Sequence, residues 1–207
     1  MENEWLQRWE DRFHKDEYAY GIEPNMFLAQ QLKNFKNGKI LFGAEGEGRN
    51  AVFAAKNNWD VSAFDISSEG KNKALKLAKL NHVTIDYKVG NLPELDFKPK
   101  EFDAIALIYA HFPADIRPKF HSILSNLLKP GGHIILEAFG EHHLAYRNKN
   151  PNVGGPKDQG SLLSVKEIQQ DFKNFKAILL EEKPITLNEG LYHNGTGSVL
   201  RFIGKKL

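Results

Sequence analysis

A glycine-rich turn and an acidic residue after it are the first features that could do chemistry. Gly46 and Gly48 lie in the segment 40–52, directly after a short apolar run, and Asp65 lies 19 residues beyond Gly46. Glycines after a strand let the backbone approach a ligand, because a Cβ there would block it. A carboxylate at the end of the next strand can accept hydrogen bonds from two ribose hydroxyls. The simpler alternative is a tight turn followed by a helix cap, but the combination favours an adenosine site.

The residues around the turn narrow the class of nucleotide. The spacing of Gly46, Gly48 and Ala51 also fits dinucleotide-binding turns, so a nicotinamide dinucleotide is an alternative. A pyrophosphate at a helix N-terminus needs free N–H groups, and the carboxylates of Glu45 and Glu47 oppose it. The same carboxylates suit a ligand that carries an ammonium and a sulfonium. The pattern therefore favours S-adenosylmethionine.

Strand and helix patterns alternate along the chain. Apolar runs predict strands at 39–42, 61–64, 83–89, 102–109, 134–139, 177–181 and 199–204. Helical spacing predicts helices on either side of 21–24 and at 50–57, 68–81 and 115–128, and the capping box of Ser164 and Glu167 predicts another. Such alternation requires right-handed crossovers and parallel strands. We expect an α/β fold, a Rossmann-like doubly wound and mostly parallel seven-stranded sheet with an antiparallel C-terminal strand and helices on both faces.

The length favours a single domain. At 207 residues the chain suits one compact domain, with 1–37 as an N-terminal helical lid and 38–139 as the cofactor-binding core. Residues 140–207 then supply a substrate-side loop and close the sheet. We place that loop at 140–161, which is rich in Asn, Gly and Pro.

Composition excludes several kinds of chemistry. Zero cysteines exclude disulfides, a thiolate nucleophile and cysteine-ligated metals, and we expect no metal site. A net charge of +2 is too small to bind a phosphate backbone over the whole surface. The acidic N-terminus does not resemble a signal peptide, and no apolar run is long enough to span a membrane. We expect a cytoplasmic protein without nucleic-acid or membrane partners, either a monomer or a homodimer.

Nearly the whole chain resembles a known enzyme family. From about Trp9 to Lys206 it is similar to the class I S-adenosylmethionine-dependent methyltransferases, and within them to the small bacterial branch of tellurite-resistance and thiopurine methyltransferases. The blocks that carry the resemblance are 18–25 with 27–28, 44–51, 65–67, 102–103, 128–132, 137–139 and 154–156. The family pattern has Asp, Gly and Cys where this chain has Phe42, Ala44 and Glu45.

The resemblance implies a role for each matching residue. The backbone of Ala44 to Gly46 would pass the methionine part of the cofactor, and Asp65 would hold its ribose. Tyr109 would stand near the transferred methyl group. The predicted cofactor-binding set is Tyr20, Asn25, Ala44, Glu45, Gly46, Gly48, Arg49, Asp65, Ile66, Asn91, Leu92 and Tyr109. In that set Ile66, Asn91 and Leu92 lie beside the adenine, and Tyr20 and Asn25 form a lid together with Phe27.

Methyl transfer from a sulfonium mainly requires that nucleophile, methyl carbon and sulfur are held in line and dry. The product is S-adenosylhomocysteine. A hydroxyl or ammonium acceptor also needs a general base, whereas a thiol or a reduced chalcogen oxyanion can be mostly ionised already. The predicted catalytic residues are His111, Tyr109 and His142, and further candidates for a base or an anion holder are His143, Arg147, His193, Arg49 and Arg201. Either arginine could equally form a surface salt bridge.

We therefore expect methyl transfer to a small-molecule acceptor, possibly a thiol or a chalcogen oxyanion. A nicotinamide-dependent oxidoreductase is disfavoured because the chain holds no Tyr-x-x-x-Lys pair. A nucleic-acid methyltransferase is disfavoured because 108–113 lacks the Pro-Pro-aromatic turn that clamps a flipped base. A catalytically silent cofactor-binding protein stays open, since binding and catalysis draw on nearly the same residues.

Overall fold

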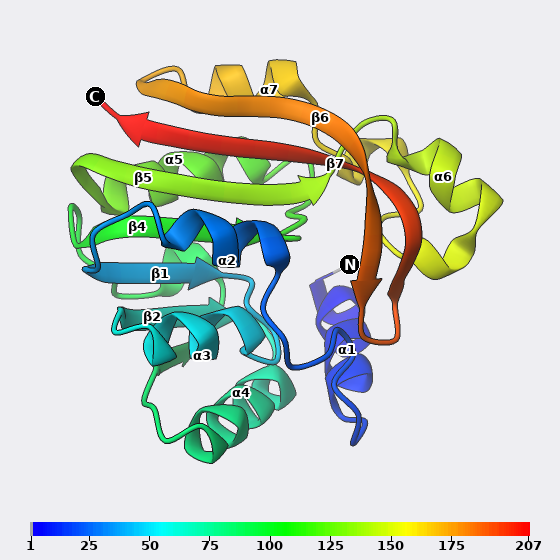
Figure 1. The fold of residues 1–207 in the computed structure, drawn as a ribbon, viewed down its shortest axis with the longest axis horizontal. Helices are drawn as coiled ribbons and strands as arrows, with labels where there is room; N and C mark the ends of the chain where they lie inside the picture. Colours follow the sequence, from blue (N-terminus) through cyan, green and yellow to red (C-terminus); the bar gives the residue numbers. More distant parts are fainter. Residues whose placement is uncertain (1) are drawn as a thin grey trace.

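One seven-stranded sheet runs through the molecule in the computed structural model, which describes residues 2–207 (Figure 1). The strand order is β3-β2-β1-β4-β5-β7-β6. The strands are β1 (Lys39–Gly43), β2 (Asp60–Asp65), β3 (Asp86–Val89), β4 (Phe102–Ile108), β5 (Leu128–Phe139), β6 (Phe175–Glu189) and β7 (His193–Lys206). The first five are parallel, and β7 is antiparallel to both β5 and β6. The predicted α/β class, strand number and mostly parallel topology are confirmed.

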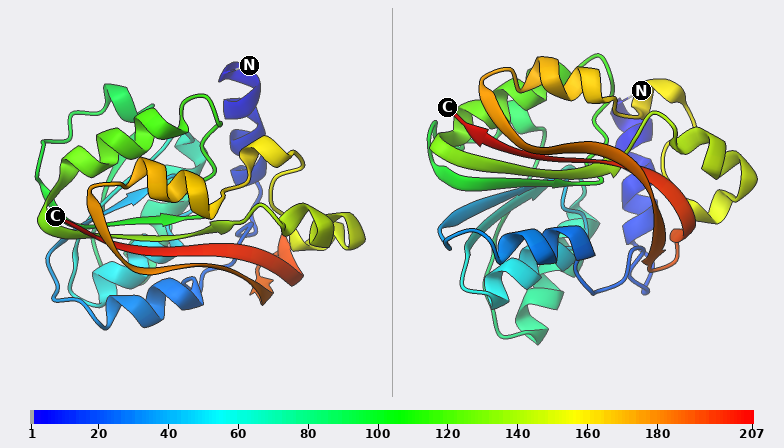
Figure 2. Two further views of the ribbon diagram at one scale, coloured as in Figure 1. Left: turned by 90° about the horizontal axis from the view of Figure 1, so that it is seen from above. Right: turned by 45° about the horizontal axis from the view of Figure 1, so that its top comes forward.

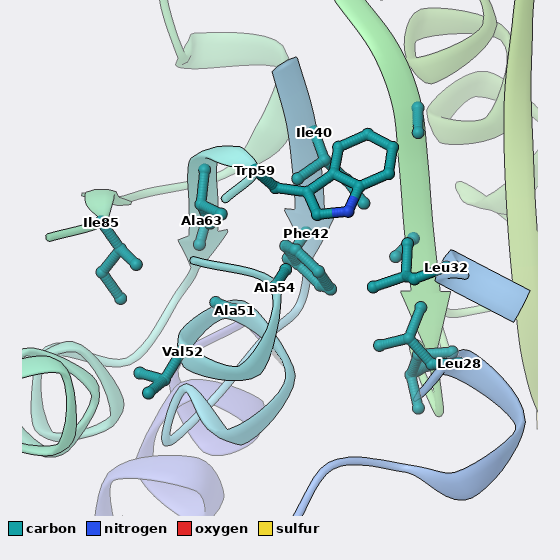
Figure 3. Packing of buried hydrophobic residues seen from close by; sticks show 14 of the residues in the cluster. Leu28, Leu32, Ile40, Phe42, Ala51, Val52, Ala54, Trp59, Ala63 and Ile85 are labelled. Atoms are coloured by element: carbon teal, nitrogen blue, oxygen red, sulfur yellow. The ribbon is translucent and has the colours of Figure 1, made fainter. Parts of the chain in front are cut away.

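Helices cover both faces of this sheet (Figure 2). They are α1 (Glu2–Phe13), α2 (Met26–Leu32), α3 (Arg49–Lys56), α4 (Ser68–Leu80), α5 (Arg117–Leu127), α6 (His143–Lys149) and α7 (Val165–Asp171). Alternate residues of β1 point to opposite faces, so Ile40 and Phe42 pack under α2, α3 and α4 (Figure 3). Leu41 packs in the second core, which is shared with α5 and α7. The two cores hold the strands rigidly, and the strand ends can therefore position a site.

The hairpin of β6 and β7 is longer than the sequence indicates. The predicted strands 177–181 and 199–204 are extended to Phe175–Glu189 and His193–Lys206. Much of β6 is partly or fully exposed, so its apolar pattern is weak, and Pro184 adds a signal against a strand. The far half of the hairpin bends toward α1 (Figure 1), where Leu191 N–H donates to the Ala19 carbonyl at 2.9 Å. The tip of the hairpin thus contacts the segment between α1 and α2.

Other boundaries also differ from the expectation. Residues 140–161 are not only a loop, because they contain α6 and two short 3₁₀ turns, η2 (Pro151–Val153) and η3 (Gln159–Ser161). A third 3₁₀ turn, η1 (Leu92–Glu94), follows β3, which is confined to Asp86–Val89 rather than 83–89. The capping box of Ser164 and Glu167 begins α7 as predicted. None of the helices in the described part of the chain combines the length and apolar character needed to cross a membrane.

Candidate functional site

The glycine turn joins β1 to α3 at the carboxyl end of β1. Ala44, Gly46 and Gly48 all have positive φ, at 52°, 59° and 87°. At Gly48 a Cβ would lie 2.5 Å from the Cβ of Ala74, so only glycine lets the turn come this close to α4. The turn lies at the edge where parallel strands end and where the order reverses between β1 and β4, which is where doubly wound folds bind ligands.

Asp65 faces this turn, as its sequence position predicts. Its Oδ2 accepts a hydrogen bond from Gly46 N–H and its Oδ1 accepts one from Ser67 N–H, both at 2.9 Å. The residue is 8% exposed, and burial raises the pKa of its carboxyl to about 6 although these N–H donors oppose the shift. A carboxylate offers about four acceptor positions, so two remain for ribose hydroxyls. Asp65 is therefore placed at the turn as expected, and its role toward a ribose stays a prediction.

The N-terminal helix α1 lies against this turn. The Glu10 carboxylate accepts hydrogen bonds from Ser67 Oγ and Ser68 N–H, both at 2.8 Å, at the beginning of α4. The Phe13 ring packs on Gly46, where an added Cβ would be 2.9 Å from its Cζ. A surface hollow of about 570 Å³ lies on the other side of α1, and its lining includes neither Gly46 nor Asp65. The chain's own residues thus cover the candidate ribose position, and the segment that covers it is α1.

The two glutamates of the turn are held by the protein itself. Glu45 Oε1 accepts hydrogen bonds from Asn50 N–H at 2.9 Å and Ala51 N–H at 2.8 Å, at the N-terminus of α3. Burial raises the pKa of this carboxyl to about 7. Glu47 Oε2 accepts from Ala19 N–H at 2.8 Å. Glu47 Oε1 is buried without a hydrogen bond to a described residue, and it pairs with Lys73 Nζ at 2.6 Å.

The residues predicted beside the adenine divide into two groups. Ile66 and Asn91 are partly exposed at the strand ends. The Leu92 side chain is instead buried in the core with Phe64, so it contributes at most backbone there. Tyr87 was not predicted, and its hydroxyl donates to the Gly46 carbonyl at 2.7 Å. Its position inside β3 gave no indication of a role in the site, since a buried tyrosine in a strand ordinarily belongs to the hydrophobic core.

A second group of polar side chains lies beyond the carboxyl ends of β4 and β5. Asn25 Nδ2 donates to Glu137 Oε1 at 2.6 Å and to Glu189 Oε1 at 3.0 Å. Arg201 Nε donates to Glu137 Oε2 at 2.6 Å, and Arg49 Nη2 donates to Glu189 Oε2 at 3.0 Å. We call these five residues the carboxylate cluster. Each of its guanidinium groups is paired with one of its carboxylates.

This cluster changes two predicted roles. Asn25 was expected in a lid that binds cofactor, but its Oδ1 accepts from Leu28 N–H and caps α2, while its Nδ2 is used by the carboxylates. Arg49 was expected to bind cofactor, but its charge is taken up by Glu189. Phe27, another expected lid residue, is buried in the core beneath the Arg201 guanidinium.

Tyr109 follows β4 and lies beside the carboxylate cluster. Its hydroxyl donates to Glu137 Oε1 at 3.3 Å, and burial raises its pKa well above the ordinary value. Its φ of 53° is unusual for a large side chain, and such strain is concentrated at functional sites. Tyr109 is thus held at the strand end where it was predicted.

His193 begins β7 and packs among aromatic rings. Its Nδ1 lies 3.0 Å from Glu189 Oε2, and its ring centroid lies 4.6 Å from that of Tyr20 and 4.5 Å from that of Tyr109. Burial lowers the pKa of the imidazole, although the Glu189 carboxylate opposes the shift. The pKa of Glu189 is held at about 2, because the His193 hydrogen bond and the Arg49 charge outweigh the effect of burial.

The geometry does not support a catalytic role for His111, the favoured candidate of the sequence. Its Nδ1 lies 2.9 Å from the Ser161 carbonyl, and its Nε2 accepts from Phe139 N–H at 3.2 Å. Both ring nitrogens are therefore used by the backbone, and burial lowers the pKa to about 4. His111 fixes the 158–163 segment against β5.

The other predicted polar residues also hold structure. His143 is buried, with one ring nitrogen at the Gly154 carbonyl and the other accepting from Ser198 N–H. Arg147 Nε donates to the Gly155 carbonyl at 3.3 Å. His142 has an exposed side chain that pairs with Glu182, and this pairing raises its pKa.

In the described part of the chain one group of three side chains could hold a metal ion, and two of the three are exposed. Ligand atoms of Glu141, His142 and Glu182 lie within 4.8 Å of one another. His142 Nδ1 and Ser198 Oγ already occupy the Glu182 carboxylate, and we assign no metal to this group.

Sequence reasoning missed Glu137 and Glu189 as site residues. Glu137 lies within a block that carried the family resemblance, and its place at the end of a buried strand could have marked it. Glu189 lies just before Gly190 in a stretch without strand signals, and only the observed hairpin brings it to Arg49. The structure therefore defines a glycine turn with Asp65 and, beside it, a buried acid–histidine–tyrosine group.

The fold and this site define a class of protein, the Rossmann-like α/β proteins with a ligand site at the strand switch point, and comparisons with known proteins narrow it. Residues 40–132 match the family model described as methyltransferase domain. The chain is 29% identical over 135 residues to sterol 24-C-methyltransferase from Candida albicans, an alignment of 60% of this chain and 36% of that protein. The chain thus spans about a third of the length of that relative.

Solved structures share the fold over almost the entire chain. A protein from a study of the conversion of a disulfide bond into a thioacetal group during echinomycin biosynthesis has a TM-score of 0.79 at 13% identity, with 98% of this chain and 92% of that chain covered. Magnesium protoporphyrin IX methyltransferase from Synechocystis PCC 6803, solved with bound S-adenosylhomocysteine, has a TM-score of 0.70 at 13% identity and full coverage of both chains. At such identity the likeness concerns the fold.

The match of residues 40–132 to a methyltransferase domain agrees with the expected enzyme class. The activity and the cofactor of the whole protein are matters for proposal. The tellurite-resistance and thiopurine branch stays a prediction of the sequence alone. The acceptor is likewise a matter for proposal.

Proposed function

We propose that the protein transfers the methyl group of S-adenosylmethionine to a small-molecule acceptor. The observation that carries the proposal is the pairing of Asp65 with the turn at Gly46, inside the segment 40–132 that matches the methyltransferase domain. The bonded donors hold the carboxylate in place and leave it acceptor capacity for two vicinal hydroxyls. We also propose that the protein is a single-domain cytoplasmic enzyme, that it acts as a monomer or homodimer, and that it has no nucleic-acid partner.

The N-terminus of α3 favours this cofactor over a nicotinamide dinucleotide. A pyrophosphate would need the free N–H groups of the first helical turn. Here Asn50 N–H and Ala51 N–H both donate to the Glu45 carboxylate, so the anion position is taken by the protein's own side chain. A cofactor with a cationic methionine end would be attracted by the Glu45 carboxylate, whereas a pyrophosphate would compete with it for the same N–H groups. We assign the Glu45 carboxylate to the ammonium, because it lies at the glycine turn along which the methionine end would pass.

Binding requires a change at α1. When bound, the cofactor supplies an electrophilic methyl group on a sulfonium. This chain must hold the ribose at Asp65, orient the methionine end along Ala44 to Gly46, and keep water out. Because Phe13 and Glu10 lie at the ribose position, we propose that α1 moves to admit the cofactor and then closes over it as the lid. Orientation of the reactants can contribute as much as about 7–11 kcal/mol to the lowering of the barrier.

The acceptor proposal follows from the charges near Tyr109. The sequence favours a thiol or a chalcogen oxyanion. An oxyanion would need an unpaired cation, and both arginines of the carboxylate cluster, Arg49 and Arg201, are neutralised by Glu189 and Glu137. Between the two classes we therefore propose the thiol, which needs no bound cation when it is neutral. The lack of an unpaired arginine in the carboxylate cluster also weakens the sequence resemblance to tellurite-resistance methyltransferases.

Calorimetric titration tests the cofactor proposal. We expect S-adenosylhomocysteine to bind and NADH not to bind. Asp65→Ala should weaken S-adenosylhomocysteine by about 1.5–3 kcal/mol, the usual contribution of hydrogen bonds to a charged group. Asp60→Ala is the matched control, since Asp60 lies exposed at the other end of β2 and should leave affinity unchanged. Binding of NADH without S-adenosylhomocysteine would overturn the proposal.

A further inference from the structure

The carboxylate cluster holds one histidine in a defined orientation. Glu189 Oε2 lies 3.0 Å from His193 Nδ1 and also accepts from Arg49 Nη2, while Glu189 Oε1 accepts from Asn25 Nδ2. A carboxylate with these donors is ionised, and it accepts a hydrogen bond from the imidazole rather than donating one. His193 therefore carries its hydrogen on Nδ1, which makes Nε2 the basic nitrogen.

The second ring nitrogen is not used by the protein. No hydrogen bond joins His193 Nε2 to any residue in the described range 2–207. This distinguishes His193 from His111 and His143, whose two ring nitrogens are both held by backbone groups. The ring lies against Tyr109, which follows β4 at the strand end beside the candidate cofactor turn.

We propose that His193 is the general base for the methyl acceptor and that Glu189 is its positioning residue. The inference rests on the proposed function. The inference deepens that function by assigning the substrate class, namely an acceptor that carries a proton on oxygen or sulfur when it binds. As the acceptor oxygen or sulfur bonds to the methyl carbon, the carbon–sulfur bond of the sulfonium breaks and the acceptor's proton passes to Nε2. The products are the methylated acceptor, S-adenosylhomocysteine and an imidazolium, which returns its proton to solvent.

The charges around His193 agree with this role. Burial lowers the imidazole pKa and keeps the base neutral, and the Glu189 carboxylate stabilises the imidazolium that forms. Titratable and charged groups face or influence the ring from α1, the 18–25 segment, α3, β4, α6 and β6, namely Arg12, Tyr20, Arg49, Tyr109, His111, His143 and Glu189. Glu189 is the only carboxylate with a hydrogen bond to the ring among the described residues.

The tautomer is the first test and needs no substrate. Nitrogen-15 NMR of histidine-labelled protein should show His193 with Nδ1 protonated and Nε2 unprotonated at pH 7. Glu189→Gln should lose this preference, and His133→Gln, a change in the middle of β5, should leave the His193 signal in place. A protonated Nε2 in the wild-type protein would overturn the assignment.

The second test uses acceptors of graded acidity with the whole enzyme. The panel is phenol, 4-nitrophenol, 2-mercaptoethanol and thiophenol, assayed at pH 7 with S-adenosylmethionine. His193→Gln should slow methylation of the weakly acidic acceptors by about 100-fold or more, as expected for loss of a general base, and of the already ionised ones by only a few-fold. Glu189→Gln should show the same dependence on acceptor acidity and shift the pH profile of kcat, which a purely structural role would not do.

The outcomes separate the inference from the proposed function. If S-adenosylhomocysteine does not bind the wild-type protein, the proposed function fails first. If it binds and His193→Gln slows all acceptors equally, or if none of the panel is methylated, the general-base assignment is wrong while the cofactor proposal stands. His133→Gln should keep wild-type rates.

Discussion

Cofactor affinity should depend on pH through Asp65. In the free protein burial raises the pKa of this carboxyl from 3.8 to about 6. Ribose hydroxyls donate hydrogen bonds to the ionised form and so lower the pKa in the complex. The complex is then favoured where Asp65 is already ionised. Affinity is therefore complete above the pKa of the free protein and falls as the pH drops below it.

The magnitude follows from the fraction of free protein that must lose a proton. One unit below a pKa of about 6, roughly ten of eleven molecules are protonated, so at pH 5 affinity should be about tenfold lower than at pH 7. This equals about 1.4 kcal/mol. Asp65 should also release close to one proton for each ligand bound at pH 5, and almost none at pH 7.

Calorimetry in buffers of different ionisation enthalpy measures both quantities with S-adenosylhomocysteine. Asp65→Asn is the matched variant, and its affinity should be weak and should lose the part of the pH dependence that Asp65 contributes. Glu45→Gln removes the second carboxyl with a raised pKa, about 7, so that the contribution of Asp65 to the pH dependence can be measured alone. An affinity of the wild-type protein that does not change between pH 5 and pH 7 refutes the assignment of Asp65 to the ribose.

Three further changes test the packing around the site. Gly48→Ala should lower the free energy of unfolding, measured in urea. A side chain at this positive φ costs about 1–3 kcal/mol through backbone strain, and the loss should be larger because the new Cβ would also meet Ala74. Arg201→Ala should cost about 3–5 kcal/mol, since it leaves the buried Glu137 carboxylate without its ion pair. His111→Ala should lower the melting temperature and leave cofactor affinity unchanged, because this side chain bonds only to backbone.

Each of these changes has a control elsewhere in the chain. Gly131→Ala has a similar positive φ but meets only the flexible end of a lysine at 3.8 Å, so it should cost less than Gly48→Ala. Lys183→Ala breaks an exposed ion pair and should change stability by at most about 1 kcal/mol. His142→Ala removes an exposed ring and should leave the melting temperature nearly unchanged. Equal effects for a change and its control would contradict the structural explanation.

Sequence reasoning reached the parts of the molecule that short-range patterns determine. The turn at Gly46 and the carboxyl of Asp65 face each other because both end adjacent parallel strands, which strand periodicity predicts. The capping box at Ser164 is equally local. Each of these features needs only a few neighbouring residues to be recognised.

The roles that failed depend on contacts between distant residues. His111 looks like a base because it follows β4, but Ser161, fifty residues later, takes its Nδ1. Arg49 looks like a cofactor ligand, but Glu189, from the hairpin, neutralises it. Nothing in the sequence around His111 or Arg49 indicates which distant residue will pair with it. Tertiary pairing therefore decided which side chains remain free.

The long hairpin of β6 and β7 has a consequence for the order of folding. The bonds of Asp65 need only residues within 46–67, but the bond from Asn25 to Glu189 closes a separation of 164 residues. Closing so large a separation is entropically costly, and such contacts tend to form late. A chain emerging from the ribosome can thus complete the nucleotide end long before the histidine end. We therefore expect the turn at Gly46 and Asp65 to gain its native hydrogen bonds before Glu189 and His193 reach theirs.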